Sequence, residues 1–253
     1  CEPASAWLFN SIANKHADAM DSFPKPNVLP REEGDKELAK VLGSILPVIL
    51  QQEDFEEVYD RVMDDKLKGG TGIYGVFWDP EKQGGLGDIA LSRVDVLNLY
   101  WESGITDLQQ SRNLFYLRME DNDRLLEAYP QLEGKLTGEA DAGQKPQTED
   151  RVDTTDKTTV IDWYYKKMQQ GKQVLHYCKF VGDTVLFATE NRHEYKARGW
   201  YDHGLYPFVM DPLFRTAGSP CGFGYIDVAK SAQEYVDRGN QAILQNMLSS
   251  ARP

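Results

Sequence analysis

The sequence predicts an α+β fold, in which long helices accompany a mixed or antiparallel β-sheet. Apolar residues recur at helical spacing over residues 6–20, 35–68 and 227–250. Between them, residues 73–189 hold short β-rich stretches separated by glycine and proline turns. A chain of 253 residues with 41% hydrophobic residues can bury a real core, in one large domain or two small ones.

The N-terminal third is predicted to be helical. A helix over 6–20 is followed by residues 22–30, whose three prolines require an extended connector. Residues 35–68 follow with one long apolar stripe, which we expect to face the core, and with Pro47 expected to kink or split the helix. The stripe consists of Leu38, Val41, Leu42, Ile45, Leu46, Ile49, Phe55, Val58, Tyr59, Val62 and Met63.

The glycines at 69–72 end this helix and open the β section. Strands are predicted at residues 73–78, 88–100 (one or two), 114–119, 158–166, 173–181 and 184–189, with a short helix at 121–129. After Tyr206–Val209 we expect the chain to turn. Residues 133–156 lack apolar periodicity and are rich in Gly, Thr, Asp and Glu, so they are expected to form an exposed loop or a disordered linker.

The final helix carries a narrow stripe of apolar and small residues, while charged and amide residues such as Asp237 are expected on its polar face. The stripe consists of Ala229, Ala232, Val236, Gly239, Ile243 and Met247. Its small members would let a second backbone approach closely, which makes these residues candidates for subunit packing.

Composition excludes several function classes. Acidic residues outnumber basic ones 40 to 28, for a net charge of −12, which disfavours a protein that grips nucleic acid but permits a surface that nucleic acid slides past. The longest apolar run, Ile45–Leu50, is too short to span a membrane. Three cysteines do not make a disulfide scaffold, and we expect reduced thiols. Because the chain begins with Cys1 and ends at Pro253, we expect an interior piece of a longer polypeptide.

Motifs for catalysis or cofactor binding are weak. There is no phosphate-binding P-loop and no nucleophile elbow, and the glycines at 69–75 follow a helix rather than a strand. A metal site would have to combine His176, Cys178, His203 and Cys221, which lack the usual ligand spacing. We therefore predict no metal, no cofactor and no enzymatic activity.

Two alternatives remain open. Asp79, Asp95, Glu102 and Asp107 near tryptophans would suit a carboxylate hydrolase. Alternatively, Trp78, Trp101 and Trp163 would serve a β-rich binding module of a virion or cell-surface protein. The aromatic and basic run at 163–167 also suggests stacking on single-stranded nucleic acid. Strand alternation explains that run equally well, with Trp163 and Tyr165 on one face and Tyr164 and Lys166 on the other.

An ordered set of segments carries a family resemblance. It comprises DDKLKGGTGIYGVFWDP (64–80), the segments 87–101, 105–108, 160–167, 203–209 and 222–227, and QEYVDRGNQAILQN (233–246). In this order they resemble the bacteriophage portal proteins, the head-to-tail connectors through which DNA is packaged.

The resemblance implies a structural subunit of a ring, usually of twelve copies, at the portal vertex of the virion, made in the host cytoplasm. Residues 1–225 would form the wing and residues 226–253 the start of the stem helix, while the clip, second stem helix and crown are absent. Terminase, the head–tail adaptor, capsid proteins and double-stranded DNA passing without sequence specificity would be its partners. We place Lys230, Arg238 and Arg252 nearest the DNA passage.

Overall fold

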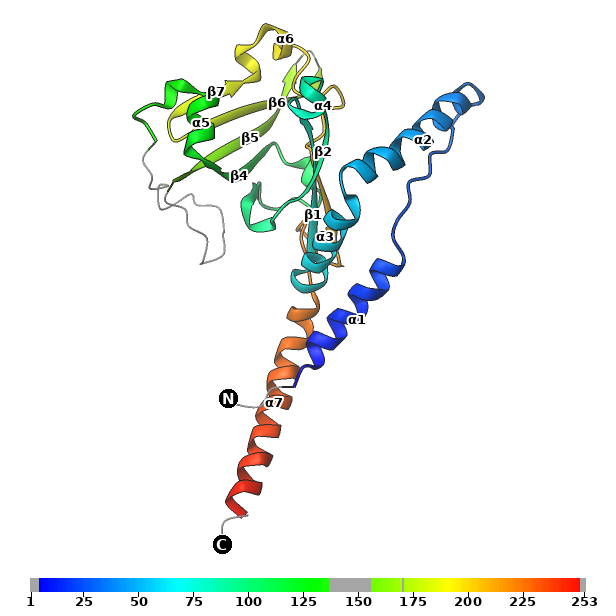
Figure 1. Cartoon of the computed structure of the whole chain (residues 1–253), viewed down its shortest axis with the longest axis vertical. Coiled ribbons are helices and arrows are strands. Elements are labelled where there is room, and N and C mark those ends of the chain that lie inside the picture. Colours follow the sequence, from blue (N-terminus) through cyan, green and yellow to red (C-terminus); the bar gives the residue numbers. More distant parts are fainter. Residues whose placement is uncertain (1–4, 137–155, 170, 251–253) are drawn as a thin grey trace. The chain divides into compact units, whose positions relative to one another are not determined.

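The computed structural model describes residues 5–136, 156–169 and 171–250, which form two compact units. The first unit combines residues up to Arg93 with those from Phe208 onward, and the second runs from Val94 to Pro207. Helices and antiparallel sheets both contribute, so the predicted α+β fold is confirmed (Figure 1). The division into a wing at 1–225 and a stem at 226–253 stays a prediction. Most of the expected loop at 133–156 lies outside the described residues.

The first unit contains the long helices. These are α1 (Trp7–Asp21), α2 (Lys36–Gln52) and α3 (Phe55–Gly69), then the short α4 (Lys82–Gly85) and the C-terminal α7 (Tyr225–Ser250), with a 3-10 turn η1 (Glu33–Asp35) before α2. Its antiparallel sheet has the order β2–β1–β8, formed by β1 (Thr71–Asp79), β2 (Asp88–Arg93) and β8 (Phe208–Pro212). A small antiparallel pair, β9 (Phe214–Arg215) and β10 (Gly222–Phe223), leads into α7.

Helix α3 and the sheet share the core of the first unit. Val62 from α3, Ile73 from β1 and Phe208 from β8 are almost completely buried. The rings of Phe77 and Phe208 meet edge to face, with centroids 5.5 Å apart. Burial of such side chains stabilises the fold by about 1.5–3 kcal/mol each.

The predicted long helix at 35–68 is split, but not at Pro47. Pro47 lies inside α2, and the chain breaks at Asp54, whose backbone adopts the left-handed conformation (φ 46°). A tertiary contact holds the break: the Glu53 carboxylate pairs with Lys82 and accepts the backbone N–H of Leu91 at 3.1 Å. The sequence pattern of α2 and α3 does not contain this information.

Strand β8 (Phe208–Pro212) was not predicted: the sequence led us to expect a turn after Tyr206–Val209 and no strand there. It pairs antiparallel with β1, with Phe208 opposite Gly75 and Pro212 opposite Thr71. Strands β1 and β8 are more than 130 residues apart in the chain, and so no local sequence pattern predicts their pairing. Other predicted strands and the short helix at 121–129 are confirmed to within a few residues.

The second unit is built on one five-stranded antiparallel sheet of order β3–β4–β5–β6–β7. Its strands are β3 (Leu99–Trp101), β4 (Asn113–Asp121), β5 (Lys157–Gln169), β6 (Lys172–Val181) and β7 (Thr184–Ala188). Short helices connect them: α5 (Asn122–Ala128), α6 (His193–Lys196) and the 3-10 turns η2 (Val96–Asn98), η3 (Leu108–Gln110), η4 (Pro130–Leu132) and η5 (Thr189–Asn191).

An ion pair between the partly exposed Arg118 and the buried Asp162 crosses the centre of this sheet. Arg118 Nε on β4 donates to Asp162 Oδ2 on β5 at 2.7 Å, and the Tyr177 hydroxyl on β6 donates to Asp162 Oδ1 at 2.5 Å. Burial, and then the Asp162 charge, raises the pKa of the Tyr177 hydroxyl, which therefore stays protonated and able to donate. The three strands are thus joined by side chains as well as by their backbone ladder.

Glycines allow the backbone at the start of α7 to pack against the end of α3 (Figure 1). A Cβ at Gly224 would overlap the carbonyl oxygen of Lys68, and a Cβ at Gly70 would overlap the backbone of Phe223. The Gly222 N–H donates to Thr71 Oγ1 at 2.9 Å, and the Gly224 N–H donates to Asp227 Oδ2 at 2.9 Å. We call the contact of residues 68–72 with 222–227 the α7 root.

Replacing Gly224 with alanine should destabilise the first unit, because the added methyl meets backbone that cannot move aside. We expect a loss of about 1–3 kcal/mol in the free energy of unfolding, measured by urea denaturation. Gly239→Ala is the matched control, since it lies within α7 with open space around its Cα. That control should be neutral or stabilising by up to about 1 kcal/mol. Equal effects of the two substitutions would contradict a close-packed root.

Candidate subunit interface

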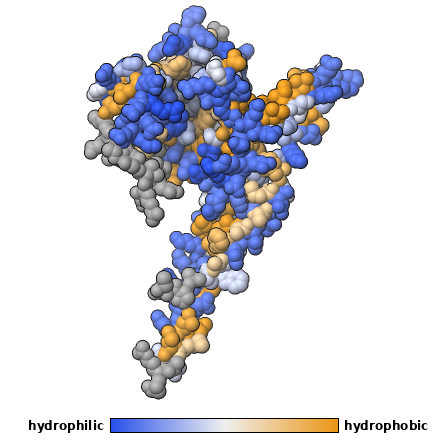
Figure 2. All heavy atoms as spheres, in the orientation of Figure 1, coloured by the Kyte–Doolittle hydropathy of each residue, from blue (hydrophilic) through white to orange (hydrophobic). Residues whose placement is uncertain are grey.

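Helix α7 carries the candidate positions singled out from the sequence, and it is exposed over most of its length. None of its residues is fully buried, and Ile243 and Met247 expose 59% and 63% of their surface. Figure 2 shows apolar surface at the C-terminal end of α7. The part of the chain that the structure describes therefore leaves much of α7 uncovered.

The predicted apolar stripe on α7 has two parts with different surroundings. Ala229, Ala232 and Val236 line a hollow of about 770 Å³ together with Trp7 and other residues of α1. Gly239, Ile243 and Met247 lie beyond the contacts with α1 and are exposed. The first part of the stripe thus faces a helix of its own chain.

Two polar side chains of α7 hold the first turn of α1. Asp237 Oδ1 accepts the Ser5 N–H at 2.8 Å and the Ser5 hydroxyl at 2.5 Å. Gln233 accepts the Leu8 N–H at 3.2 Å and donates to the Ser5 carbonyl at 2.6 Å. Helix α1 has no capping side chain of its own and no acidic residue in its first turn. We call these contacts the α1 clasp.

Gln233 satisfies the free N–H of Leu8 in the first turn of α1, and the Asp237 carboxylate, which anchors Ser5 just before the helix, complements the helix dipole. Hydrogen bonds from Gln233 and Ser5 lower the pKa of the Asp237 carboxyl below its ordinary value of 3.8. The sequence predicts a polar face of α7 that includes Asp237, and the structure adds that this carboxylate accepts hydrogen bonds from Ser5. The i, i+4 spacing of Gln233 and Asp237 puts them on one face, but only the fold shows what they meet.

The three basic candidates for the DNA passage were Lys230, Arg238 and Arg252. Lys230 and Arg238 are exposed on α7, and neither makes an ion pair or a side-chain hydrogen bond with a described residue. Arg252 lies outside the described residues. Both described side chains are therefore free to meet a polyanion.

Helix α2 presents a second apolar surface that sequence analysis had placed in the core. Only Ala39 of this helix is buried. Large aliphatic residues spaced three or four apart are exposed along one face: Leu38, Val41, Leu42, Ile45 and Val48. Figure 2 shows this face as orange spheres on α2. We call these five residues the α2 apolar face.

The carboxylates considered for hydrolysis have local structural partners. Asp95 and Asp107 each accept the backbone N–H two residues ahead at 2.9 Å, and Asp79 does the same at 3.0 Å. Glu102 accepts from the Asn113 amide at 2.9 Å, which with the Arg112 N–H lowers its pKa. A general acid needs a raised pKa. Every described carboxyl with a shifted pKa has it lowered: Asp88, Glu102, Glu190 and Asp237.

The tryptophans of the binding-module alternative are divided between the two units. Trp78 belongs to the first unit, and Trp101 and Trp163 belong to the second. The Trp163 ring stacks on Tyr165 with centroids 4.3 Å apart, while Tyr164 packs on Tyr177 across the other face. The predicted strand alternation is confirmed, and Tyr164 and Tyr165 are too buried for bases to stack on them.

Among the candidate metal ligands, His176 has hydrogen-bond partners of its own. The buried His176 ring lies 3.1 Å from Thr189 Oγ1 through Nδ1 and 2.8 Å from the Gln169 amide nitrogen through Nε2. Cys221 belongs to the first unit, whereas His176, Cys178 and His203 belong to the second. Within the described ranges, no three His, Cys, Asp or Glu side chains converge as metal ligands.

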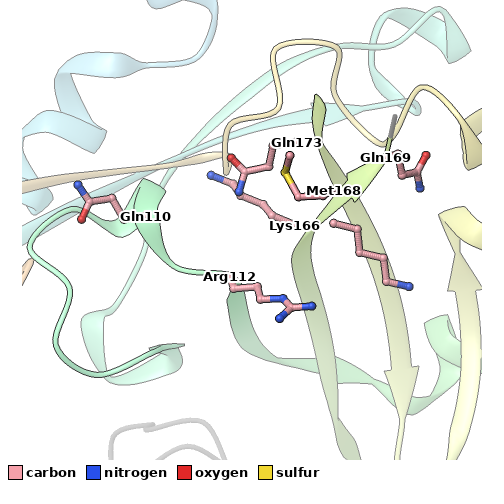
Figure 3. Close-up of a pocket in the computed structure, with 7 residues that line it drawn as sticks. Gln110, Arg112, Lys166, Met168, Gln169 and Gln173 are labelled. Carbon is pink, nitrogen blue, oxygen red and sulfur yellow. The ribbon is translucent and has the colours of Figure 1, made fainter. Parts of the chain in front are cut away.

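A hollow of about 530 Å³ in the second unit has no acid–base pair (Figure 3). Its lining consists of Gln110, Arg112, Lys166, Lys167, Met168, Gln169 and Gln173. Lys167 pairs with Glu190 at 2.5 Å, and Lys166 donates to the Gln109 carbonyl at 2.5 Å. Burial lowers the pKa of Lys166, whose ammonium lies 4.3 Å from the centre of the Tyr206 ring. Both lysines thus make contacts that link β5 to neighbouring segments of the second unit.

Most of the candidate catalytic and metal-binding side chains thus have hydrogen-bond or ion-pair partners nearby. Two helices, by contrast, present open apolar faces, as in a structural subunit of a larger assembly. The sequence matches the phage P22-like portal protein family over residues 17–204. This match covers well over half of the chain, and the chain belongs to that family. No curated protein gives a significant match.

Membership confirms the portal resemblance found in the sequence. Portal proteins are structural rather than enzymatic, form an oligomeric ring associated with the capsid, and are components of the virion. In the described parts of the chain, no helix is long and apolar enough to cross a membrane. Helix α7 lies outside the matched residues, and so its role rests on its own geometry.

Asp237→Ala should loosen α1, because it removes the acceptor for both Ser5 donors. We expect tryptic cleavage at Lys15 to become several-fold faster. Glu234→Ala is the control, since Glu234 is an exposed neighbour on the same helix that makes no contact with Ser5.

The same clasp predicts a pH dependence. Because the folded-state pKa of Asp237 is lowered, its contribution is complete well above the ordinary pKa of 3.8 and is lost as the pH falls through the lower folded-state pKa. Asp237→Asn should therefore differ from the wild type in the order of α1, followed by NMR, at neutral pH but not in strong acid. A difference that persists unchanged in strong acid would show that the carboxylate charge is not responsible.

Proposed function

We propose that this portal subunit forms part of the conduit through which DNA enters the capsid during packaging and leaves it during ejection. The same ring would be the attachment point for the tail. Membership of the portal family is the observation that carries this proposal. The open apolar faces on α2 and α7 support it, because each subunit of a closed ring must bury surface against its neighbours.

Charge supports the conduit role. At −12, the chain repels a polyanion overall, so that double-stranded DNA can pass without being trapped or read. In our proposal Lys230, Arg238 and Arg252 lie nearest the passage and give it weak, sequence-independent contacts. These side chains would contact the DNA phosphates, and contacts from solvent-exposed cations are weak and readily broken.

The proposed assembly is a ring of twelve subunits at the portal vertex. In it, residues 1–225 serve as the wing and 226–253 as the start of the stem. Residues of the α7 stripe pack between subunits, while terminase, the head–tail adaptor and capsid proteins bind elsewhere on the ring. Ala229, Ala232 and Val236 already face α1, so the second part of the stripe, Gly239, Ile243 and Met247, is the part most accessible to a neighbour.

The double variant Lys230→Gln/Arg238→Gln tests the conduit. Electron microscopy of the purified protein should show closed rings with a central opening for both wild type and variant. In an in vitro packaging reaction, the variant should yield several-fold fewer filled particles. Lys196→Gln/Arg198→Gln, which removes two cations from the second unit, is the charge-matched control and should package normally. If the wild type forms no rings, the proposed ring assembly is wrong. If the variant packages DNA normally, Lys230 and Arg238 do not line the DNA passage.

A further inference from the structure

The α2 apolar face exposes large aliphatic side chains that are normally buried against another surface. Its central residue, Ile45, is 46% exposed, and Leu38 at one end is 60% exposed. A helix that is apolar on most of its surface is normally buried, because such a face in water forgoes the hydrophobic stabilisation of its side chains. Pro47 weakens this helix further by removing a backbone hydrogen bond. Within the described residues, only the inward side of α2 is covered.

Helix α7 offers a second surface of matching character. Ile243 and Met247 share one face with Gly239, which has no neighbouring atom near the position of a Cβ. Another helix can approach closely there. The α2 face spans residues 38–48, about 15 Å along its axis, and the open α7 face spans 239–248, about 14 Å. We call residues 239–248 the distal α7 face.

Charge singles out these two faces within an acidic chain. Residues 38–52 contain no Asp or Glu, and residues 239–250 contain no charged residue at all. Two copies that each carry −12 repel one another over most of their surface. Contact at these two segments buries apolar area without bringing carboxylates together.

We propose that the α2 apolar face of one copy packs against the distal α7 face of the next copy in the ring. This inference rests on the proposed ring. The contact joins two unlike surfaces of the same chain, so each subunit uses its α2 toward one neighbour and its α7 toward the other. Repetition of such a head-to-tail contact closes into a ring when the rotation between copies permits.

Single charge substitutions test both faces. Ile45→Glu and Ile243→Glu should each weaken assembly of the full chain at least about tenfold in concentration, as expected for a central interface residue. Controls on the polar sides of the same helices, Gln51→Glu and Gln245→Glu, should assemble like the wild type. Both isoleucines are about half exposed, so the variants should fold, which circular dichroism checks.

Two combinations distinguish this pairing from other arrangements. An equal mixture of Ile45→Glu and Ile243→Glu chains retains one intact pair of faces, and so sedimentation should show dimers but no rings. The single chain Ile45→Lys/Ile243→Glu should recover rings at low salt, because opposite charges then meet across each contact.

A photo-crosslinking residue at position 45 identifies the occupant directly. In mixed isotope-labelled copies, we expect crosslinks to residues 239–250 of a second copy. Crosslinks to residues 137–155 of either copy, or to another capsid protein, would overturn the proposal. Wild-type rings whose assembly is unaffected by Ile45→Glu would overturn this pairing while leaving the ring itself standing, whereas a wild type that forms no rings would count against the proposed function.

Discussion

Close backbone packing at the α7 root is the constraint on which the rest of the first unit depends. Gly70 and Gly224 bring the end of α3, the start of β1 and the start of α7 to distances that a Cβ would prevent. Asp227 then closes the first turn of α7 by accepting the Gly224 N–H. The root therefore joins α7 through backbone atoms to the helix and strand that form the core of the first unit.

Elsewhere in the described chain, several polar side chains make contacts within the subunit, whereas two apolar helix faces remain open. Gln233 and Asp237 cap α1, Glu53 fixes the break between α2 and α3, and Arg118 with Asp162 joins the central strands of the second unit. None of these groups forms a catalytic pair. The α2 apolar face and the distal α7 face, by contrast, have too little cover within the described chain. Such exposed apolar surface is expected on an unassembled subunit of a ring-forming structural family.

Local sequence patterns predicted most elements but not their partners. Helical spacing located α1 and α7, and alternation with glycine turns located β5, β6 and β7. Strand β8 was missed because its partner β1 is remote in sequence, and the break at Asp54 was missed because it depends on Glu53 reaching Lys82. The α2 stripe looks like a core-facing stripe, since periodicity reveals that a face must be buried but not whether its cover belongs to the same molecule. Likewise, the α7 stripe was found, whereas its contact with α1 was not.

If the open helix faces become covered when copies assemble, as we propose, amide hydrogen exchange will differ between monomer and ring. We expect slow exchange at residues 70–72 and 222–224 in both states, because the root is internal to each subunit. Exchange in residues 38–52 and 239–250 should be fast in the monomer and strongly slowed in the ring. Equal exchange of these two helical segments in both states would show that neither face is covered by a neighbouring copy.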